Sequence, residues 1–191
     1  MAQHPRSSSS ELYTSGLESL LFLESQHEEL HPLMMSLATS EKLKTYLAEL
    51  PPIIRRQRRR LELLLRSAPG ETCGEPPTRN RLEEDLEELR LVREAAARDA
   101  ELISASTWIA GLKLEQYAAS RNRAITLGYV EAARHLQRSL NAVGGSNLRL
   151  LALAHRSNYP ATRRTLGEAI ADVSGLIGFS APAFAAESAW N

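Results

Sequence analysis

Residues 15–40 read SGLESLLFLESQHEELHPLMMSLATS, and this stretch carries the pattern that decides the fold. Side chains recur along it at steps of three and four: Leu17, Leu20, Leu21, Glu24, His27, Glu28, His31 and Met35. Such steps place side chains on one face of an α-helix, which completes a turn every 3.6 residues. Pro32 predicts an interruption near the end of this helix, because proline has no amide hydrogen to donate. Residues 36–40 then predict its end.

Three further stretches predict helices: residues 41–66, 81–127 and 129–156. Residues 67–79, SAPGETCGEPPTR, are rich in Gly and Pro and predict the longest connection of the fold. Asn80 predicts the helix start that follows. The connections near residues 37–41 and at Gly128 are short, so we expect the helices that they join to be antiparallel.

Two of these stretches are expected to break. Pro51-Pro52 predicts a break near Leu50, because two prolines remove two backbone donors and clash with the preceding turn. A helix over the whole of 81–127 would exceed the usual length in globular proteins, so we expect a break near 94–98.

The composition excludes several classes of protein. The chain has 191 residues with 23 Lys+Arg and 23 Asp+Glu, a balance that does not favour nucleic acid or acidic membrane as a partner. A single Cys excludes a disulfide framework, and no apolar run is long enough to span a bilayer. The polar N-terminus lacks the apolar segment of a secretory signal. We therefore predict a cytoplasmic protein with no membrane span.

The predicted fold class is all-α, because the alternation typical of strands is nowhere sustained. We predict a flexible leader at residues 1–10, a helical bundle at 11–156, and an extra C-terminal helix with an apolar tail at 157–191. The leader is rich in Ser, whereas the last part holds apolar side chains up to Trp190. Such a tail needs a surface to cover, either its own bundle or a partner.

Four short motifs give the chain a resemblance to a known family. They are residues 33–40 (LMMSLATS) followed by Leu43 and Lys44, residues 71–73 (ETC), residues 99–103 (DAELI), and residues 127–128 (LG) followed by 131–134 (EAAR). With these motifs in order, roughly residues 15–155 resemble the YciE/YciF-like branch of the ferritin-like superfamily. The resemblance implies a ferritin-like antiparallel four-helix bundle of bacterial origin, in a family linked with stress responses.

The same resemblance implies a di-iron site of inward Glu and His side chains, drawn from four helices. Glu24 stands where the first-helix ligand would be. The other three ligand regions read LPPII at 50–54, AGLK at 110–113 and QRSLNAVGG at 137–145. The nearest other acids would be ligands only in a different register: Glu49, Glu115 and Glu131. We therefore predict an apolar bundle centre without a di-iron site or cofactor, in a non-enzymatic structural or interaction protein.

An alternative is a metalloprotein with a residual or relocated site on the first helix. Residues 27–31 read HEELH, which matches the H-E-x-x-H pattern of zinc proteases, with two imidazoles one turn apart. Pro32 follows directly and the longer metzincin motif is absent, so a protease is disfavoured. The alternative site would hold zinc or iron through Glu24, His27 and His31. The simpler interpretation is a polar cluster that is partly buried or faces a partner.

Five of the six residues from 55 to 60 are arginines: Arg55, Arg56, Arg58, Arg59 and Arg60. Consecutive side chains point in different directions around a helix, so they do not form one stripe. They favour a salt-bridged or protein-binding surface, with the acidic run at 83–88 as an internal partner, over contact with nucleic acid. Together with Trp190 they are our candidate interaction residues. We expect a homodimer or another protein partner.

Overall fold

Four long helices form the body of the molecule: α1 (Ser9–Leu37), α3 (Leu50–Ser67), α5 (Ala95–Thr126) and α6 (Val130–Arg156). The shorter elements are α2 (Glu41–Ala48), α4 (Arg81–Glu88) and the 3-10 helix η1 (Leu89–Leu91). This computed structural model describes residues 9–69 and 81–156, and that part of the chain contains no β-strand. Nor does any helix in it have both the length and the apolar character needed to cross a membrane.

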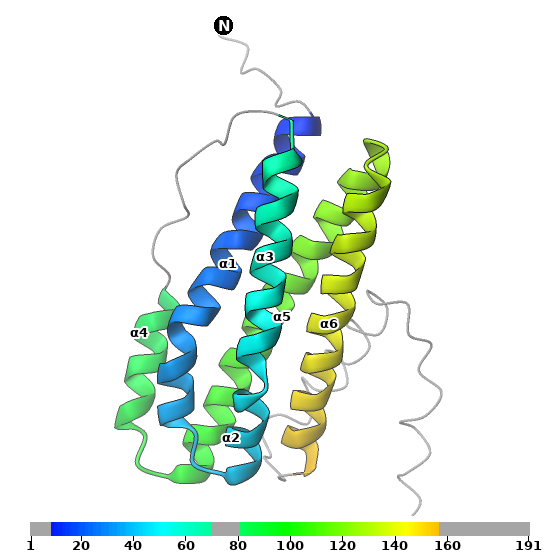
Figure 1. Ribbon diagram of the computed structural model, residues 1–191. Helices are drawn as coiled ribbons and strands as arrows, with labels where there is room; N and C mark the ends of the chain where they lie inside the picture. The colour runs from blue at the N-terminus through cyan, green and yellow to red at the C-terminus, as the bar shows by residue number, and fades with distance from the viewer. Residues whose placement is uncertain (1–8, 70–80, 157–191) are drawn as a thin grey trace, which may run out of the picture.

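The long helices form a bundle with up and down neighbours (Figure 1). α1 and α3 are antiparallel and joined through α2, while α5 and α6 are antiparallel and joined at Gly128. α3 and α5 run in the same direction. α4 lies between these two helices in sequence, runs in the opposite direction and packs beside α1. The predicted antiparallel pairs are confirmed. A bundle with one long crossover is one of the known four-helix arrangements.

Proline and glycine divide the helices largely where the sequence predicts. The break near Leu50 is confirmed, because α3 begins there with both prolines in its first turn, where a missing amide hydrogen costs no helical bond. The break expected near 94–98 falls slightly earlier, since η1 ends at Leu91 and α5 begins at Ala95. Gly128 has φ of 77°, the left-handed conformation predicted after a last helical turn.

The predicted interruption at Pro32 is wrong, because α1 continues through it to Leu37. A proline inside a helix costs about 3 kcal/mol. Burial of the turn that follows offsets this cost, since the side chains of Met34 and Leu37 are buried and each contributes about 1.5–3 kcal/mol. α1 also begins at Ser9, inside the predicted leader. The rest of the leader, Asn80 and residues 157–191 lie outside the described residues.

Asp99, in the first turns of α5, joins two of the motifs that carry the family resemblance. Its buried carboxylate accepts the backbone N–H of Thr39 at 2.7 Å and that of Ser40 at 2.8 Å. Ser40 is in turn the N-cap of α2, and its hydroxyl accepts the N–H of Leu43 at 3.3 Å. The carboxylate therefore fixes the turn between α1 and α2 against the start of α5.

We expect Asp99→Ala to lower the free energy of unfolding by about 3 kcal/mol, because two charge-assisted hydrogen bonds are lost and two amides lose their acceptor. Urea titration followed by circular dichroism measures this loss. Asp99→Asn keeps one acceptor and is expected to lose about half as much. Glu101→Ala, at an exposed position two residues away on the same helix, is the control and should stay within about 0.5 kcal/mol of wild type. A loss under about 1 kcal/mol for Asp99→Ala would contradict the capping role.

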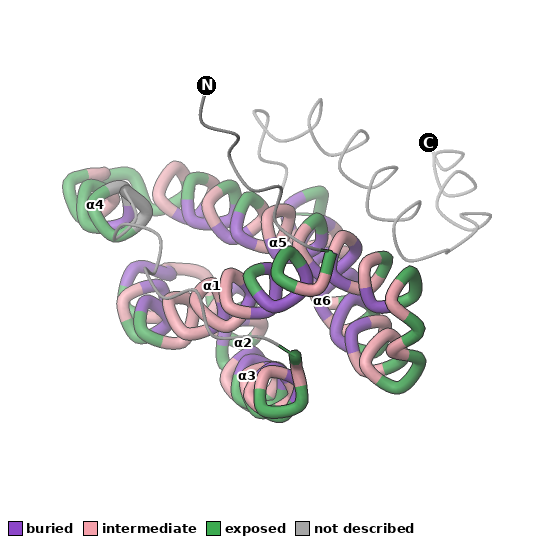
Figure 2. The backbone as a smooth tube through the Cα atoms, turned by 90° about the horizontal axis from the view of Figure 1, so that it is seen from above, coloured by how far each residue is buried: buried purple, intermediate pink, exposed green. Residues whose placement is uncertain are grey.

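Two apolar clusters fill the interior, one toward each end of the bundle. The first lies around α2 and includes Leu30, Ile54 and Ile109. The second lies toward the other end and includes Leu20 and Leu114. Figure 2 shows the buried side of each long helix facing the others. The space between the clusters is polar, and the candidate site lies there.

Candidate functional site

A layer of polar side chains separates the two apolar clusters. The polar layer consists of Glu24 and His27 on α1, Gln57 on α3, and Lys113 and Tyr117 on α5. Each belongs to the inward face of its helix, because it lies three or four residues from an apolar core position, as Glu24 does from Leu20. The helical periodicity that builds the core thus also brings these groups together.

The carboxylate of Glu24 is the centre of the polar layer. Lys113 Nζ donates to Glu24 Oε2 at 2.6 Å, and the Tyr117 hydroxyl donates to Oε1 at 3.1 Å. With the Gln57 amide assigned so that its nitrogen faces the carboxylate, that nitrogen lies 2.8 Å from Oε1 and 3.2 Å from Oε2. Glu24 and Lys113 are 0 % and 2 % exposed. The carboxylate is therefore fully removed from water and satisfied by three donors.

His27 extends this network on the other side of the ammonium. Its Nδ1 lies 2.7 Å from Lys113 Nζ. Burial lowers the pKa of His27 well below 6.5, and the nearby charges of Lys113 and His31 lower it further. The ring is therefore neutral near pH 7. An ammonium can only donate, so Nδ1 accepts and the ring hydrogen is on Nε2.

Burial also shifts the two partners of Glu24 on α5. It lowers the pKa of Lys113 below 10.5, while the attraction and hydrogen bond of Glu24 oppose that shift. Burial raises the pKa of Tyr117 well above 10.0, and the charge of Glu24 adds to the rise. Tyr117 is thus a neutral donor over the physiological range. The polar layer holds one negative and one positive charge.

The structure does not gather the three predicted metal ligands. Glu24 and His27 share Lys113, whereas the His31 ring has a different partner, with its Nε2 2.8 Å from the carbonyl oxygen of Leu47. That contact ties the last turns of α1 to α2. Within residues 9–69 and 81–156, no three His, Cys, Asp or Glu side chains are grouped so that they could hold a metal ion.

The predicted apolar centre is wrong, because the bundle is polar at this level. Lys113 ends the stretch AGLK at 110–113, for which the sequence predicts only the absence of metal ligands. A signal was present: Lys113 lies four residues before Tyr117 and four after Ile109, on the buried face of α5. A lysine at a core position of a helix needs an acid in reach, and Glu24 was already the candidate acid.

The five arginines at 55–60 have different surroundings. Arg55, Arg56 and Arg59 are exposed, whereas Arg58 and Arg60 are partly buried. Arg58 forms an ion pair with Glu28 of α1, and Arg60 Nη1 lies 3.5 Å from the hydroxyl of Ser139. α4, with the acidic run at 83–88, packs against α1 and α5 (Figures 1 and 2). Arg58 therefore pairs with Glu28 and not with the acidic run at 83–88 that the sequence predicts as a partner. Trp190 lies outside the described residues.

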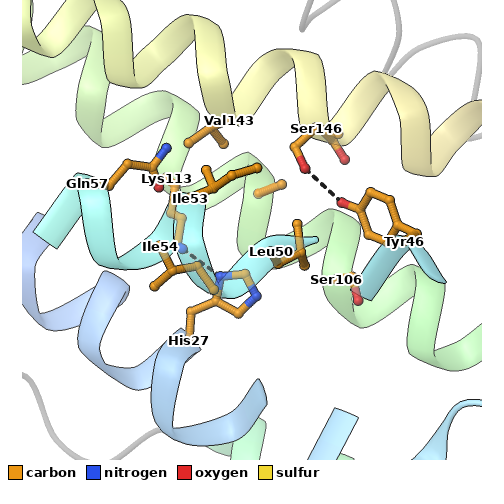
Figure 3. A pocket seen from close by; sticks show the side chains of 12 residues that line it. His27, Tyr46, Leu50, Ile53, Ile54, Gln57, Ser106, Lys113, Val143 and Ser146 are labelled. Atoms are coloured by element: carbon orange, nitrogen blue, oxygen red, sulfur yellow. Dashed lines mark hydrogen bonds between the residues drawn. The ribbon is translucent and has the colours of Figure 1, made fainter. Parts of the chain in front are cut away.

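A small cavity adjoins the polar layer (Figure 3). Its volume is about 40 Å³, and side chains from α1, α2, α3, α5 and α6 line it. His27, Gln57 and Lys113 belong to the polar layer, and Tyr46 lies nearby with its hydroxyl 3.1 Å from that of Ser146. Ile54 and Val143 supply part of the apolar wall.

Comparisons with known proteins give matches to one family and to solved structures. The family model described as "Domain of unknown function (DUF892)" matches residues 8–158. The crystal structure of the E. coli stress protein YciF has a TM-score of 0.67 at 20% identity, over 80% of this chain and 98% of that chain. YcfI from Rhodopseudomonas palustris, provisionally described as a structural protein, has a TM-score of 0.67 at 18% identity, over 78% of this chain and 97% of that chain. No curated protein matches.

These similarities show the fold. The prediction of an all-α, ferritin-like antiparallel four-helix bundle is confirmed for the described residues. The expected likeness to YciF is confirmed as well, since that chain is matched over nearly its whole length.

Proposed function

Because the chain belongs to the DUF892 family, whose model covers residues 8–158, we propose that it is a ferritin-like bundle in which an internal ion pair stands in place of a di-metal centre. Such a protein acts through its surface, as a non-catalytic structural or interaction protein. One observation carries the proposal: Lys113 Nζ lies 2.6 Å from Glu24 Oε2 at the middle of the bundle.

The donor set of the polar layer does not fit two metal ions. A di-iron or di-manganese site uses several carboxylates and imidazoles. Here one carboxylate, Glu24, is surrounded by the ammonium of Lys113, the hydroxyl of Tyr117 and the amide of Gln57, all of which donate hydrogen bonds to it. A cation at Glu24 would lie against a positive charge. The ammonium compensates the carboxylate in the way that a metal ion would.

Two further points support a structural and stress-related role. One matched structure is named a stress protein and the other is provisionally described as structural, and neither name refers to an enzymatic reaction. We also include a cytoplasmic location in the proposal.

Metal analysis of protein purified without chelators tests the proposal. We expect far less than one iron or manganese per chain, because the polar layer already holds its own cation. Glu24→Gln is the test variant, because it removes the only carboxylate of the polar layer. Glu49→Gln is the control, because it alters an exposed acid that pairs with Arg149. Stoichiometric metal that is lost in Glu24→Gln but kept in Glu49→Gln would contradict the proposal.

The surface best suited to a second copy of the chain lies on α5 beside η1. Trp108 is 53 % exposed and Leu91 is 80 % exposed, and Trp108 lines a groove with Leu89 and Val92. The groove is also lined by polar side chains: Glu88, Glu101 and Ser104. It is therefore mixed in character, and an exposed aromatic side chain in such a surface is typical of protein–protein contacts. We include a homodimer through this face in the proposal.

We expect Trp108→Lys to raise the dissociation constant of the dimer about thirtyfold, because a buried aromatic contact is worth about 2 kcal/mol. Sedimentation equilibrium measures it. Ile125→Lys, another exposed apolar position on α5, is the matched control. A monomeric wild type, or equal shifts in both variants, would contradict this assignment.

A further inference from the structure

Two of the residues that line the cavity beside the polar layer each have a buried polar atom without a hydrogen-bond partner. The first is Oδ1 of Asn147, a side chain on α6 that is 2 % exposed. The second is Nε2 of His27 on α1, which is also buried. Both residues line the cavity of about 40 Å³. Figure 3 shows the His27 ring with one nitrogen bonded to Lys113 and the other directed away from that bond.

The hydrogen-bonding character of these two atoms is fixed by their chemistry. His27 Nδ1 accepts from the ammonium of Lys113 at 2.7 Å, so the neutral ring carries its hydrogen on Nε2 and that atom is a donor. Asn147 Oδ1 is an amide oxygen and is an acceptor. A buried donor and a buried acceptor without partners each cost about 1–3 kcal/mol. A ligand that supplies the complementary acceptor and donor removes both costs.

The charge of the surroundings selects a neutral ligand. Lys113 lines the cavity, and Glu24, which does not line it, compensates the charge of Lys113 at 2.6 Å. An ion of either sign would lose its hydration beside a pair that is already compensated. Ile54, Val143 and Ala110 add apolar surface to the wall. A small neutral group with a short apolar end fits these conditions.

We propose that this cavity is a binding site for a small primary amide, whose carbonyl oxygen accepts from His27 Nε2–H and whose NH₂ group donates to Asn147 Oδ1. A space of this size takes about three water-sized groups, since one needs roughly 10–15 Å³, so the ligand has about three or four non-hydrogen atoms. The site goes beyond the role in structure and interaction, because it assigns a ligand class to the interior of the bundle.

Titration of the full chain with acetamide tests the site. NMR signals of the His27 ring and of the Asn147 side-chain amide are expected to shift saturably, with a dissociation constant of about millimolar for so small a ligand. Acetate has nearly the same shape but carries a charge, and we expect no saturable shift with it. Absence of saturation with acetamide, or equal binding of acetate, would overturn the proposal. A long-lived internal water that acetamide does not displace would also overturn the proposal.

Asn147→Leu removes the acceptor at similar size, and we expect it to weaken acetamide binding about fivefold to tenfold, the effect of one lost hydrogen bond. Asn141→Leu alters an exposed amide on the same helix and should bind as wild type does. If Asn147→Leu does not fold, Asn147→Ala replaces it. Unchanged binding in the folded Asn147 variant would overturn the assignment. Metal content is read from a different measurement, so failure of this site and failure of the metal-free proposal are distinguishable.

Discussion

Lys113→Met lowers the free energy of unfolding by about 3–5 kcal/mol at pH 7, the cost of leaving a buried carboxylate without its countercharge. Glu24 is 0 % exposed and would keep only the neutral donors Tyr117 and Gln57. Methionine has a similar length to lysine, so little cavity volume is created. Urea titration of wild type and variant, with the midpoint and slope fitted together, measures the loss.

A matched control identifies the origin of this loss. Lys44→Met breaks the exposed pair with Glu41 and should cost less than about 1 kcal/mol. A Lys113 loss as small as the Lys44 loss would contradict a buried ion pair.

Most of the fold follows from signals that are local in sequence. Apolar steps of three and four predict the long helices, the paired prolines predict the break at Leu50, and Gly128 adopts the conformation expected of a glycine after a helix. Pro32 is the exception, because contacts of Met34 and Leu37 with other helices outweigh the local cost. A local rule does not include energy that comes from packing between distant segments.

The candidate site was only half predictable, for the same reason. Glu24 was identified from its place on the first helix, but its cation comes from a residue 89 positions later. Periodicity assigns Lys113 to an inward face, yet it does not state which acid lies opposite. His31 was grouped with His27 on the shared helix face, whereas α2 provides a carbonyl that binds it. The position of α2 depends on a turn held by Asp99, which no single stretch of sequence encodes.

The converse substitution, Glu24→Gln, is expected to cost about 3–5 kcal/mol at pH 7, because the ammonium of Lys113 then has no countercharge in the interior. The pH dependence of this loss follows from Lys113. Burial lowers the pKa of Lys113 and Glu24 raises it, so removing the carboxylate lowers that pKa further below 10.5. Between the folded pKa and 10.5 the unfolded chain binds more protons, so stability rises with pH in that window. We therefore expect Glu24→Gln to regain stability on alkalinisation.

The double variant Glu24→Gln/Lys113→Met separates the ion pair from the packing around it. The double variant has neither the carboxylate nor the ammonium in its interior, and the glutamine oxygen still accepts from Tyr117. We therefore expect its loss in the free energy of unfolding to be at least 3 kcal/mol smaller than the sum of the two single losses. Its stability should also lose the pH dependence that Glu24→Gln shows. Additive losses would mean that the two side chains act independently, which a buried contact of 2.6 Å between opposite charges does not allow. The coupling energy is thus the direct measure of how strongly Glu24 and Lys113 stabilise each other inside the bundle.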